Sequence, residues 1–163
     1  MASKLKNLSD FSHTSVPNGR NFKFGILVSE WNAEITGALY QGAFDTLLAH
    51  GVAEENIFSY SVPGSFELSG AADILLGKKS ALDGVICLGC VIQGDTKHFD
   101  FICNAVADGI TNVGIKYSKP AIFGVLTTND FEQAKDRAGG KHGNKGDEAA
   151  VTALKMAEFS STI

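Results

Sequence analysis

The chain has 163 residues, a formal net charge of -4, 44% hydrophobic and 20% charged residues, a composition typical of one globular domain with a single core and not of a disordered chain. The slightly acidic balance lacks the basic stripe that nucleic-acid binding needs. Because the start of the chain and the longest apolar run are too short for a signal peptide or a membrane helix, we expect a cytoplasmic protein without nucleic-acid or membrane partners.

Residues 1–21 are polar and have no hydrophobic period, so we expect an N-terminal arm there, either a disordered tail or an extra strand at an interface. From residue 22 onward, apolar runs alternate with helical spacings, and strands are expected at 22–28, 56–62, 84–92 and 121–127. Since these runs are apolar along their length, helices should cover both sheet faces. Residues 22–163 are therefore expected to form one α/β domain, a flavodoxin-like three-layer α/β/α sandwich on a four-stranded parallel sheet.

Four short stretches follow the expected strands, and three of them are crowded with aromatic or ionisable residues. They are "SEWN" at 29–32, "PGSFE" at 63–67, "QGDTKH" at 93–98 and "TTND" at 127–130. In an open parallel sheet, ligands bind beyond the carboxyl ends of the strands, where helix N-termini present unpaired N–H groups. All four stretches fall at that edge, which is where the sequence predicts a site.

The stretch "GDTKH" at 94–98 has the residues of an anion cradle. Gly94 allows close approach of the backbone, Thr96 adds a hydroxyl and Lys97 a positive charge. Asp95 opposes this interpretation, and an ordinary helix start capped by Asp95 or Thr96 is an equal alternative. His98 follows directly and can accept and donate protons near neutral pH, although a lone histidine often has no such role.

Two further stretches offer a contact to an aromatic or hydroxylated ligand. Trp31, the only tryptophan, follows a strand directly, so it is either a platform for an aromatic ring or a core residue. Glu67 and the backbone of Ser65 and Phe66 can bond hydroxyl or amide groups. The alternative for Ser65 is that it caps the next helix.

The cysteines and the basic glycine-rich stretch each have a structural and a functional interpretation. Cys87 and Cys90 have C-x-x-C spacing, but three residues along a strand place them on opposite faces, and no second pair completes a metal site. Reduced thiols are expected. The stretch "RAGGKHGNKG" at 137–146 is not a nucleotide P-loop. It is expected to be a mobile basic loop, or one that sends Arg137 and Lys145 to an anionic substrate.

Four motifs together resemble the lumazine synthase family. They are "VPGSFEL", "VIQGDTKHFDF", "FGVLTT" and "RAGGKHGNKGDEAA", in that family's order and spacing, and the similarity runs from about Phe22 to Phe159. The resemblance implies a transferase of riboflavin biosynthesis. It would condense 5-amino-6-(D-ribitylamino)uracil with 3,4-dihydroxy-2-butanone 4-phosphate to 6,7-dimethyl-8-ribityllumazine, releasing phosphate and water, with no metal or organic cofactor.

The resemblance further implies which residues contact the two small-molecule substrates. Trp31 would stack on the pyrimidine, whose ring edge and ribityl chain would meet Ser65, Phe66 and Glu67. The backbone of Cys90, Val91 and Ile92 would line the pocket. Gly94, Asp95 and Thr96 would form the phosphate cradle, and His98 would transfer protons. Two residues depart from the family pattern, because Gln93 stands where many members carry arginine and Asp95 where a small neutral residue is common.

An adjacent subunit would complete the site. Phe123, Arg137 and Lys145 correspond to residues that the family supplies from a neighbour, with Arg137 pairing with the phosphate. The resemblance therefore implies a homo-oligomer, either a pentamer or an icosahedral shell, with riboflavin synthase as a possible partner. Two alternatives of other classes are a flavodoxin-like module that binds a flavin without turnover and a shell protein whose catalysis has decayed.

Overall fold

The computed structural model describes residues 7–12 and 14–163. In chain order it contains β1 (Phe24–Ser29), α1 (Ala33–Ala49), η1 (Glu54–Asn56), β2 (Ile57–Val62), η2 (Ser65–Glu67), α2 (Leu68–Lys78), β3 (Gly84–Ile92), α3 (His98–Tyr117), β4 (Ala121–Thr128), α4 (Phe131–Lys135), β5 (Ala138–Gly140), β6 (Gly143–Asn144) and α5 (Lys145–Thr162). The four main strands lie within two residues of their expected bounds. None of the helices in this described part is long and apolar enough to cross a membrane.

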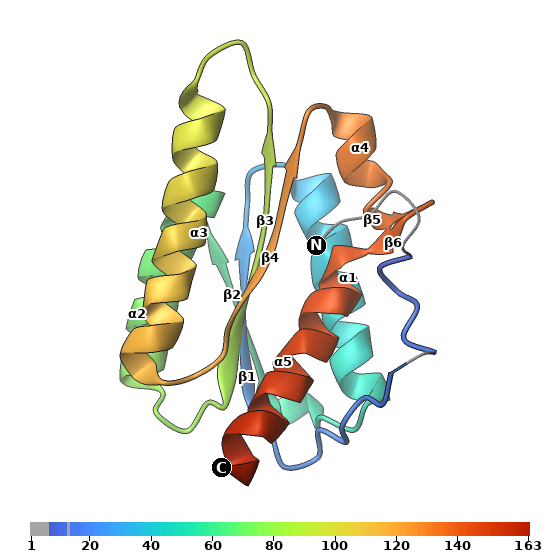
Figure 1. The fold of residues 1–163 in the computed structure, drawn as a ribbon, viewed down its shortest axis with the longest axis vertical. Coiled ribbons are helices and arrows are strands. Elements are labelled where there is room, and N and C mark those ends of the chain that lie inside the picture. Colours follow the sequence, from blue (N-terminus) through green and yellow to red (C-terminus); the bar gives the residue numbers. More distant parts are fainter. Residues whose placement is uncertain (1–6, 13) are drawn as a thin grey trace.

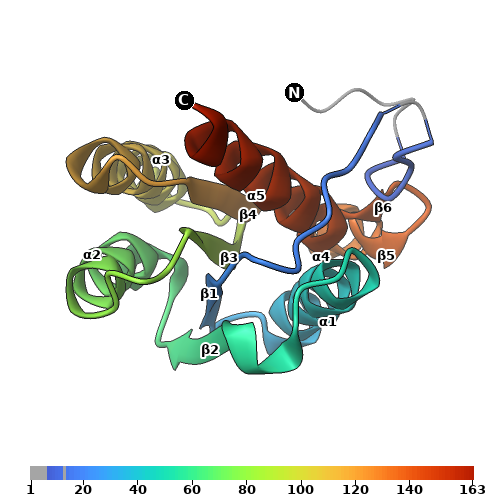
Figure 2. The same cartoon turned by 90° about the horizontal axis from the view of Figure 1, so that it is seen from below.

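The main sheet has four parallel strands in the order β2-β1-β3-β4. Helices α2 and α3 cover one face, whereas α1, α4 and α5 lie on the other (Figure 1). The view from below separates the two helical layers clearly, with the sheet between them (Figure 2). The expected flavodoxin-like three-layer sandwich is confirmed.

Alternation along β3 divides the interior into two cores. Ile86 and Leu88 pack in the core shared with α1 and α5, whereas Val85 and Cys87 pack in the core shared with α2 and α3. Cys90 belongs to the first of these cores and Cys87 to the second. The two thiols therefore lie on opposite faces of the sheet, as their spacing predicted.

The glycine-rich stretch after α4 is a β-hairpin, so the expectation of a mobile loop was wrong. Strands β5 and β6 pair antiparallel, and α5 begins at once with Lys145. Asn144 secures this corner: its Nδ2 donates to the Ala38 carbonyl at 2.9 Å, and its Oδ1 accepts from the Gly146 N–H at 2.8 Å, which caps α5. Gly143 has a φ of 79°, a conformation that glycine adopts without steric cost.

The described part of the N-terminal arm, 7–12 and 14–21, contains neither helix nor strand, and it contacts the rest of the domain. Leu8 is buried, and its N–H donates to the His142 carbonyl at 2.7 Å. Ser9 Oγ accepts from the Asn144 N–H at 2.9 Å. The arm therefore packs on the β5–β6 hairpin, and any interface strand within residues 1–6 lies outside the described residues.

Candidate active site

The carboxyl ends of the four main strands meet at one edge, the upper edge of the sheet in Figure 1. Ser29 aligns with Val62, and Ile92 aligns with Thr128. Because Val28 is the last residue of β1 paired with β3, opposite Leu88, the final residues of β3 extend beyond the end of β1. We call this edge, with the turns that follow the strands, the carboxyl rim.

Trp31 lies on the surface of the carboxyl rim, in the turn between β1 and α1, and its side chain is 73% exposed. The core interpretation of this residue was therefore wrong. Its N–H donates to the Pro63 carbonyl at 3.3 Å, which ties its turn to the one after β2. A Cβ added to Gly64 would lie 3.4 Å from the Trp31 ring and 3.0 Å from a Glu67 carboxylate oxygen. The indole and this carboxylate thus flank the same glycine.

Asn32 connects two parts of the carboxyl rim, and it was not among the site residues predicted from the sequence. Its backbone is left-handed, with a φ of 60°, and its Nδ2 donates to the Cys90 carbonyl at 3.0 Å. This bond joins the β1 turn to the part of β3 that extends past β1. An available signal was that asparagine is one of the few residues that tolerate a left-handed backbone.

Two substitutions at Asn32 should separate its two contributions to stability. Asn32→Ala loses the bond to Cys90 and also strains the left-handed backbone, so we expect a loss of about 2 kcal/mol in the free energy of unfolding. Asn32→Gly loses only the bond and should cost about 1 kcal/mol. Urea unfolding of both variants measures the difference. Equal losses would contradict a role for the backbone conformation.

The turn that forms η2 exposes two side chains and buries the third. Phe66 is 54% exposed and Glu67 is exposed, whereas Ser65 is buried. No side-chain bond caps η2 or α2, and within the described chain the Ser65 hydroxyl has no hydrogen-bond partner. The capping interpretation of Ser65 was therefore wrong.

Residues 93–98 are exposed on the turn between β3 and α3. Lys97 is the N-cap residue of α3, with no side-chain cap, so neither Asp95 nor Thr96 occupies that position as the alternative supposed. Thr96 Oγ1 still accepts from the His98 N–H at 3.3 Å. A Cβ on Gly94 would meet no atom of the described chain within 4 Å. Packing within the chain thus does not require glycine there.

The side chain of Gln93, one of the two departures from the family pattern, is engaged within its own turn. Its Nε2 donates to the Gly94 carbonyl at 2.9 Å, and its backbone N–H donates to the Thr128 carbonyl at 2.8 Å. The amide therefore closes the turn between β3 and α3. Because the Gln93 amide is neutral, the positive charge of this turn comes from Lys97.

The last residues of β3 contribute to the carboxyl rim mainly through their backbone. Burial raises the pKa of the Cys90 thiol to about 11, which keeps it neutral near pH 7, and its carbonyl accepts from Asn32. Val91 and Ile92 are half-buried. Over residues 7–12 and 14–163, no group of three or more His, Cys, Asp or Glu side chains could hold a metal ion.

The remaining three site candidates lie away from His98 in the same chain. Phe123 is five residues before the end of β4, about 16 Å along a strand, and it packs toward α2 and α3. Arg137 Nη1 donates to the Gln133 carbonyl at 3.0 Å, and Lys145 pairs with Glu148 at 2.9 Å. Helix α4 and the hairpin lie on the α1 side of the sheet, opposite α3 (Figure 1). One chain therefore does not unite these residues with His98.

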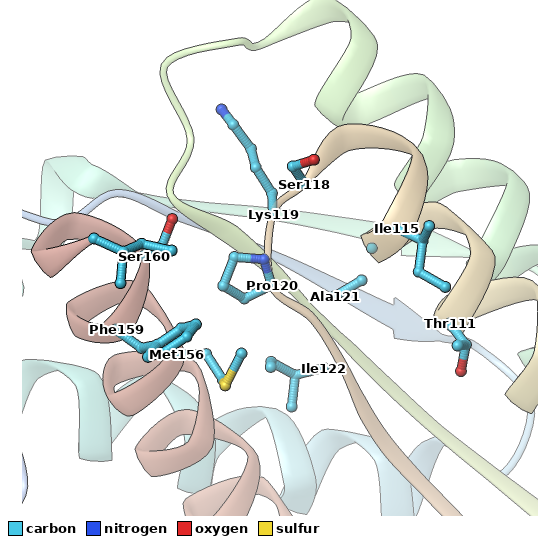
Figure 3. Close-up of a pocket in the computed structure, with 12 residues that line it drawn as sticks. Thr111, Ile115, Ser118, Lys119, Pro120, Ala121, Ile122, Met156, Phe159 and Ser160 are labelled. Carbon is cyan, nitrogen blue, oxygen red and sulfur yellow. The ribbon is translucent and has the colours of Figure 1, made fainter.

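An apolar cleft of about 490 Å³ lies at the opposite end of the sheet, where β4 begins. Met156 and Phe159 of α5 and Ile115 of α3 line it from either side of Pro120 and Ile122 (Figure 3). Its lining is mostly apolar, and Phe159 and Ile115 are exposed. It is separate from the carboxyl rim because it sits at the start of a strand whose end forms that rim.

The fold and the carboxyl rim define a class: a flavodoxin-like α/β protein with exposed aromatic, acidic and imidazole side chains beyond the ends of its strands. The sequence model of 6,7-dimethyl-8-ribityllumazine synthase matches residues 21–161. The chain belongs to this family, which confirms the resemblance inferred from the four motifs.

Several relatives named 6,7-dimethyl-8-ribityllumazine synthase match this chain over nearly its whole length. The protein of Cytophaga hutchinsonii is 63% identical over 156 residues, covering 96% of this chain and 97% of its own. That of Porphyromonas gingivalis is 55% identical, with 96% and 97% covered. That of Parabacteroides distasonis is 53% identical, with 99% and 100% covered.

Proposed function

We propose that this protein condenses 5-amino-6-(D-ribitylamino)uracil with 3,4-dihydroxy-2-butanone 4-phosphate to form 6,7-dimethyl-8-ribityllumazine, with release of phosphate and water. This makes it a transferase of riboflavin biosynthesis. The observation that carries the proposal is the family match over residues 21–161, which includes all four motifs.

The pyrimidine substrate is assigned to the rim around Gly64. Trp31 stacks on the ring, and Glu67 with the backbone of Ser65 and Phe66 bonds its polar edge and the ribityl chain. The exposed indole and the nearby carboxylate support this assignment. An exposed aromatic ring is otherwise an unfavourable use of apolar surface. The backbone of Cys90, Val91 and Ile92 closes the pocket from the β3 side.

The phosphate is assigned to Gly94, Asp95 and Thr96 at the start of α3. Open space beside Gly94 and the start of α3, where Lys97 provides no side-chain cap, support it, because the first N–H groups of a helix have no partner within the helix. Asp95 is repulsive to an anion unless its carboxylate turns away, which increases the need for cations. Lys97 supplies one within the chain, and Arg137 of a neighbouring subunit supplies the other as a bidentate partner.

Catalysis depends mainly on holding the two substrates in register. The pyrimidine carries its own amine nucleophile, so positioning alone can supply several kcal/mol of the barrier reduction. The amine condenses with the ketone with loss of one water, phosphate leaves by elimination, and the second amine adds to the remaining carbonyl and closes the ring with loss of a second water. His98, at the start of α3 beside the proposed phosphate cradle, can relay a proton in each of these steps.

A neighbouring copy supplies Phe123, Arg137 and Lys145, which makes the protein a homo-oligomer, either a pentamer or an icosahedral shell. Two observations support this. Arg137 follows α4, which lies on the α1 side of the sheet, whereas His98 begins α3 on the other side (Figure 1). The strand β4 is at the sheet edge and borders an exposed apolar cleft. Light scattering distinguishes the pentamer from the icosahedral shell. Riboflavin synthase is the candidate protein partner of either assembly.

The free cysteines support a cytoplasmic location. Cys87, Cys90 and Cys103 are free thiols, as is usual for proteins of a reducing compartment. Burial raises the pKa of Cys87 to about 12, so this thiol is inert and not a redox centre. Fractionation of cells that produce the protein would test this location.

The activity is tested by incubating the purified oligomer with both substrates. We expect formation of the lumazine and release of inorganic phosphate well above the rate without protein, followed by absorbance and by phosphate assay. A rate equal to the spontaneous one would refute the proposal. Stoichiometric flavin binding without turnover would support the binding-module alternative instead.

Arg137→Ala should mainly weaken use of the phosphorylated substrate. The loss of a bidentate, charge-assisted contact should raise its KM about tenfold to a hundredfold, with little change in the KM for the pyrimidine. Lys135→Ala is the matched control, because Lys135 is an exposed cation of the same segment with only a 3.7 Å contact to Glu34. An unchanged KM for the phosphorylated substrate in Arg137→Ala would contradict the assignment.

Mixed oligomers test whether the site is shared between subunits. His98→Ala and Arg137→Ala chains would each be weak alone, but co-expression should create interfaces at which both native residues meet. We expect the mixed oligomer to be more active than either parent. Activity equal to the average of the parents would place Arg137 and His98 in the same chain's site.

A further inference from the structure

Two serine hydroxyls near the carboxyl rim are buried and have no hydrogen-bond partner among the described residues. Ser29 ends β1 and is 1% exposed, and Ser65 begins η2 and is 6% exposed. Neither Oγ atom has a hydrogen-bond partner within residues 7–12 and 14–163. Buried polar side-chain atoms are nearly always hydrogen-bonded, so two such hydroxyls in one region need an explanation.

Ser65 lies over Gly89 of β3, and Ser29 is next to Gly89 on β1. A Cβ added to Gly89 would lie 2.5 Å from Ser65 Oγ, which places this hydroxyl directly above β3. Val28 pairs with Leu88, so the next residues along the two strands, Ser29 and Gly89, are neighbours.

Strand alternation places Ser29 on the same side of the sheet as Ser65. Leu27 and Cys87 pack in the core of α2 and α3, and Ser29 and Gly89, two residues further along their strands, face the same way. Leu68, which follows η2 and belongs to that core, also contacts the Gly89 position. The Ser29 and Ser65 side chains therefore lie on the same side of the sheet, on either side of the Gly89 position.

We propose that one buried water bridges Ser29 Oγ and Ser65 Oγ and that Ser29 is thereby a positioning residue for the η2 turn. A water is the ligand that suits two hydroxyls on adjacent elements that do not bond one another, because it can donate to one and accept from the other. Both hydroxyls are closed to bulk solvent, and buried polar groups without a protein partner are the groups that ordered waters satisfy.

The water anchors the turn that carries Phe66 and Glu67. Ser65 is the first residue of that turn, and its hydroxyl is the only side-chain polar group that the turn directs into the core. Fixing Ser65 to the end of β1 also fixes the turn relative to Trp31, two residues beyond Ser29. This functional part rests on the proposed function, in which that turn and Trp31 hold the pyrimidine.

A crystal structure of the assembled protein at about 1.5 Å resolution tests the bridge directly. We expect one ordered water within about 2.7–3.2 Å of both Oγ atoms and its disappearance in Ser29→Ala. A direct bond between the hydroxyls, or a protein acceptor for either of them, would overturn the proposal. This result does not depend on whether the protein makes lumazine.

Denaturation of three variants provides a second test of the water. Ser29→Ala and Ser65→Ala should each lower the denaturant midpoint, because each leaves the other hydroxyl without its bridge. The double variant should be no less stable than the weaker single variant, since both polar groups are then gone. Additive losses would contradict a shared water. Ser61→Ala, an exposed hydroxyl on β2, is the control and should not shift the midpoint.

Kinetics test the positioning role. Ser29→Ala should raise the KM for the pyrimidine about fivefold, the effect of one hydrogen bond, while the KM for the phosphorylated substrate and kcat stay unchanged. Equal rises in both KM values would contradict positioning of this turn. If the native protein has no turnover but the water is present, only the proposed function fails.

Discussion

His98→Ala is expected to lower kcat about tenfold to a hundredfold, at or below the low end of the range for loss of a general acid or base. The expected effect is not larger because the substrate brings its own nucleophile and most of the rate comes from positioning. Both KM values should change little, since the imidazole is not assigned to binding either substrate. Steady-state kinetics above the spontaneous rate measure the effect.

Assembly should survive this substitution. His98 is exposed at the start of α3, so its side chain contributes little packing within the chain, and light scattering should give the native size. His50→Ala is the control, because His50 is another histidine at a helix end, the C-cap residue of α1, remote from the carboxyl rim. A His98→Ala variant with native kcat would remove the proton relay from the mechanism.

Gly146→Ala is expected to cost about 3 kcal/mol or more of stability and to leave little folded protein. A Cβ at this position would collide with the Leu39 carbonyl oxygen and would lie 3.0 Å from the Ala43 backbone nitrogen. Both are backbone atoms of α1, so the collision cannot be relieved by turning a side chain. Helices α1 and α5 would have to move apart, which would open the core on that face of the sheet.

Gly70→Ala is the matched control for Gly146→Ala. It makes the same substitution inside a helix, α2, but its Cβ would meet no atom of the described chain within 4 Å. Alanine is also more favourable than glycine inside a helix by about 0.5–1 kcal/mol, so the free energy of unfolding should be unchanged or raised. The amount of soluble protein and urea unfolding compare the two variants. Equal behaviour would show that the α1–α5 contact tolerates a methyl group.

Local patterns were sufficient to predict most of the fold. The apolar run at 84–92 became β3 with the same bounds, and the other main strands shifted by at most two residues. The prediction failed at 137–146, where glycines and lysines suggested a mobile loop. The hairpin there depends on bonds from Asn144 to Ala38 and from Leu8 to His142, partners that are far away along the chain and leave no local signal.

The candidate site also has features that the sequence predicted and features that it did not. The order of strands and turns in the sequence predicted that one edge of the sheet carries Trp31, Glu67 and His98, because the carboxyl ends of parallel strands lie at the same edge. That Trp31 is exposed, that Asn32 bonds the Cys90 carbonyl and that Ser65 is buried instead of capping a helix could not be predicted. Each depends on which side chains of other elements are within reach.

The sequence by itself determined the α/β layering, the positions of the strands and the edge at which the polar turns gather, because hydrophobic period and strand direction are local properties of the chain. Only the tertiary structure decided that Gly146 packs on the backbone of α1, that Ser29 and Ser65 are buried, and that Arg137 follows a helix on the other side of the sheet from α3. These are contacts between elements far apart in sequence, and they depend on packing and hydrogen bonding that exist only once the sheet and its helices have assembled.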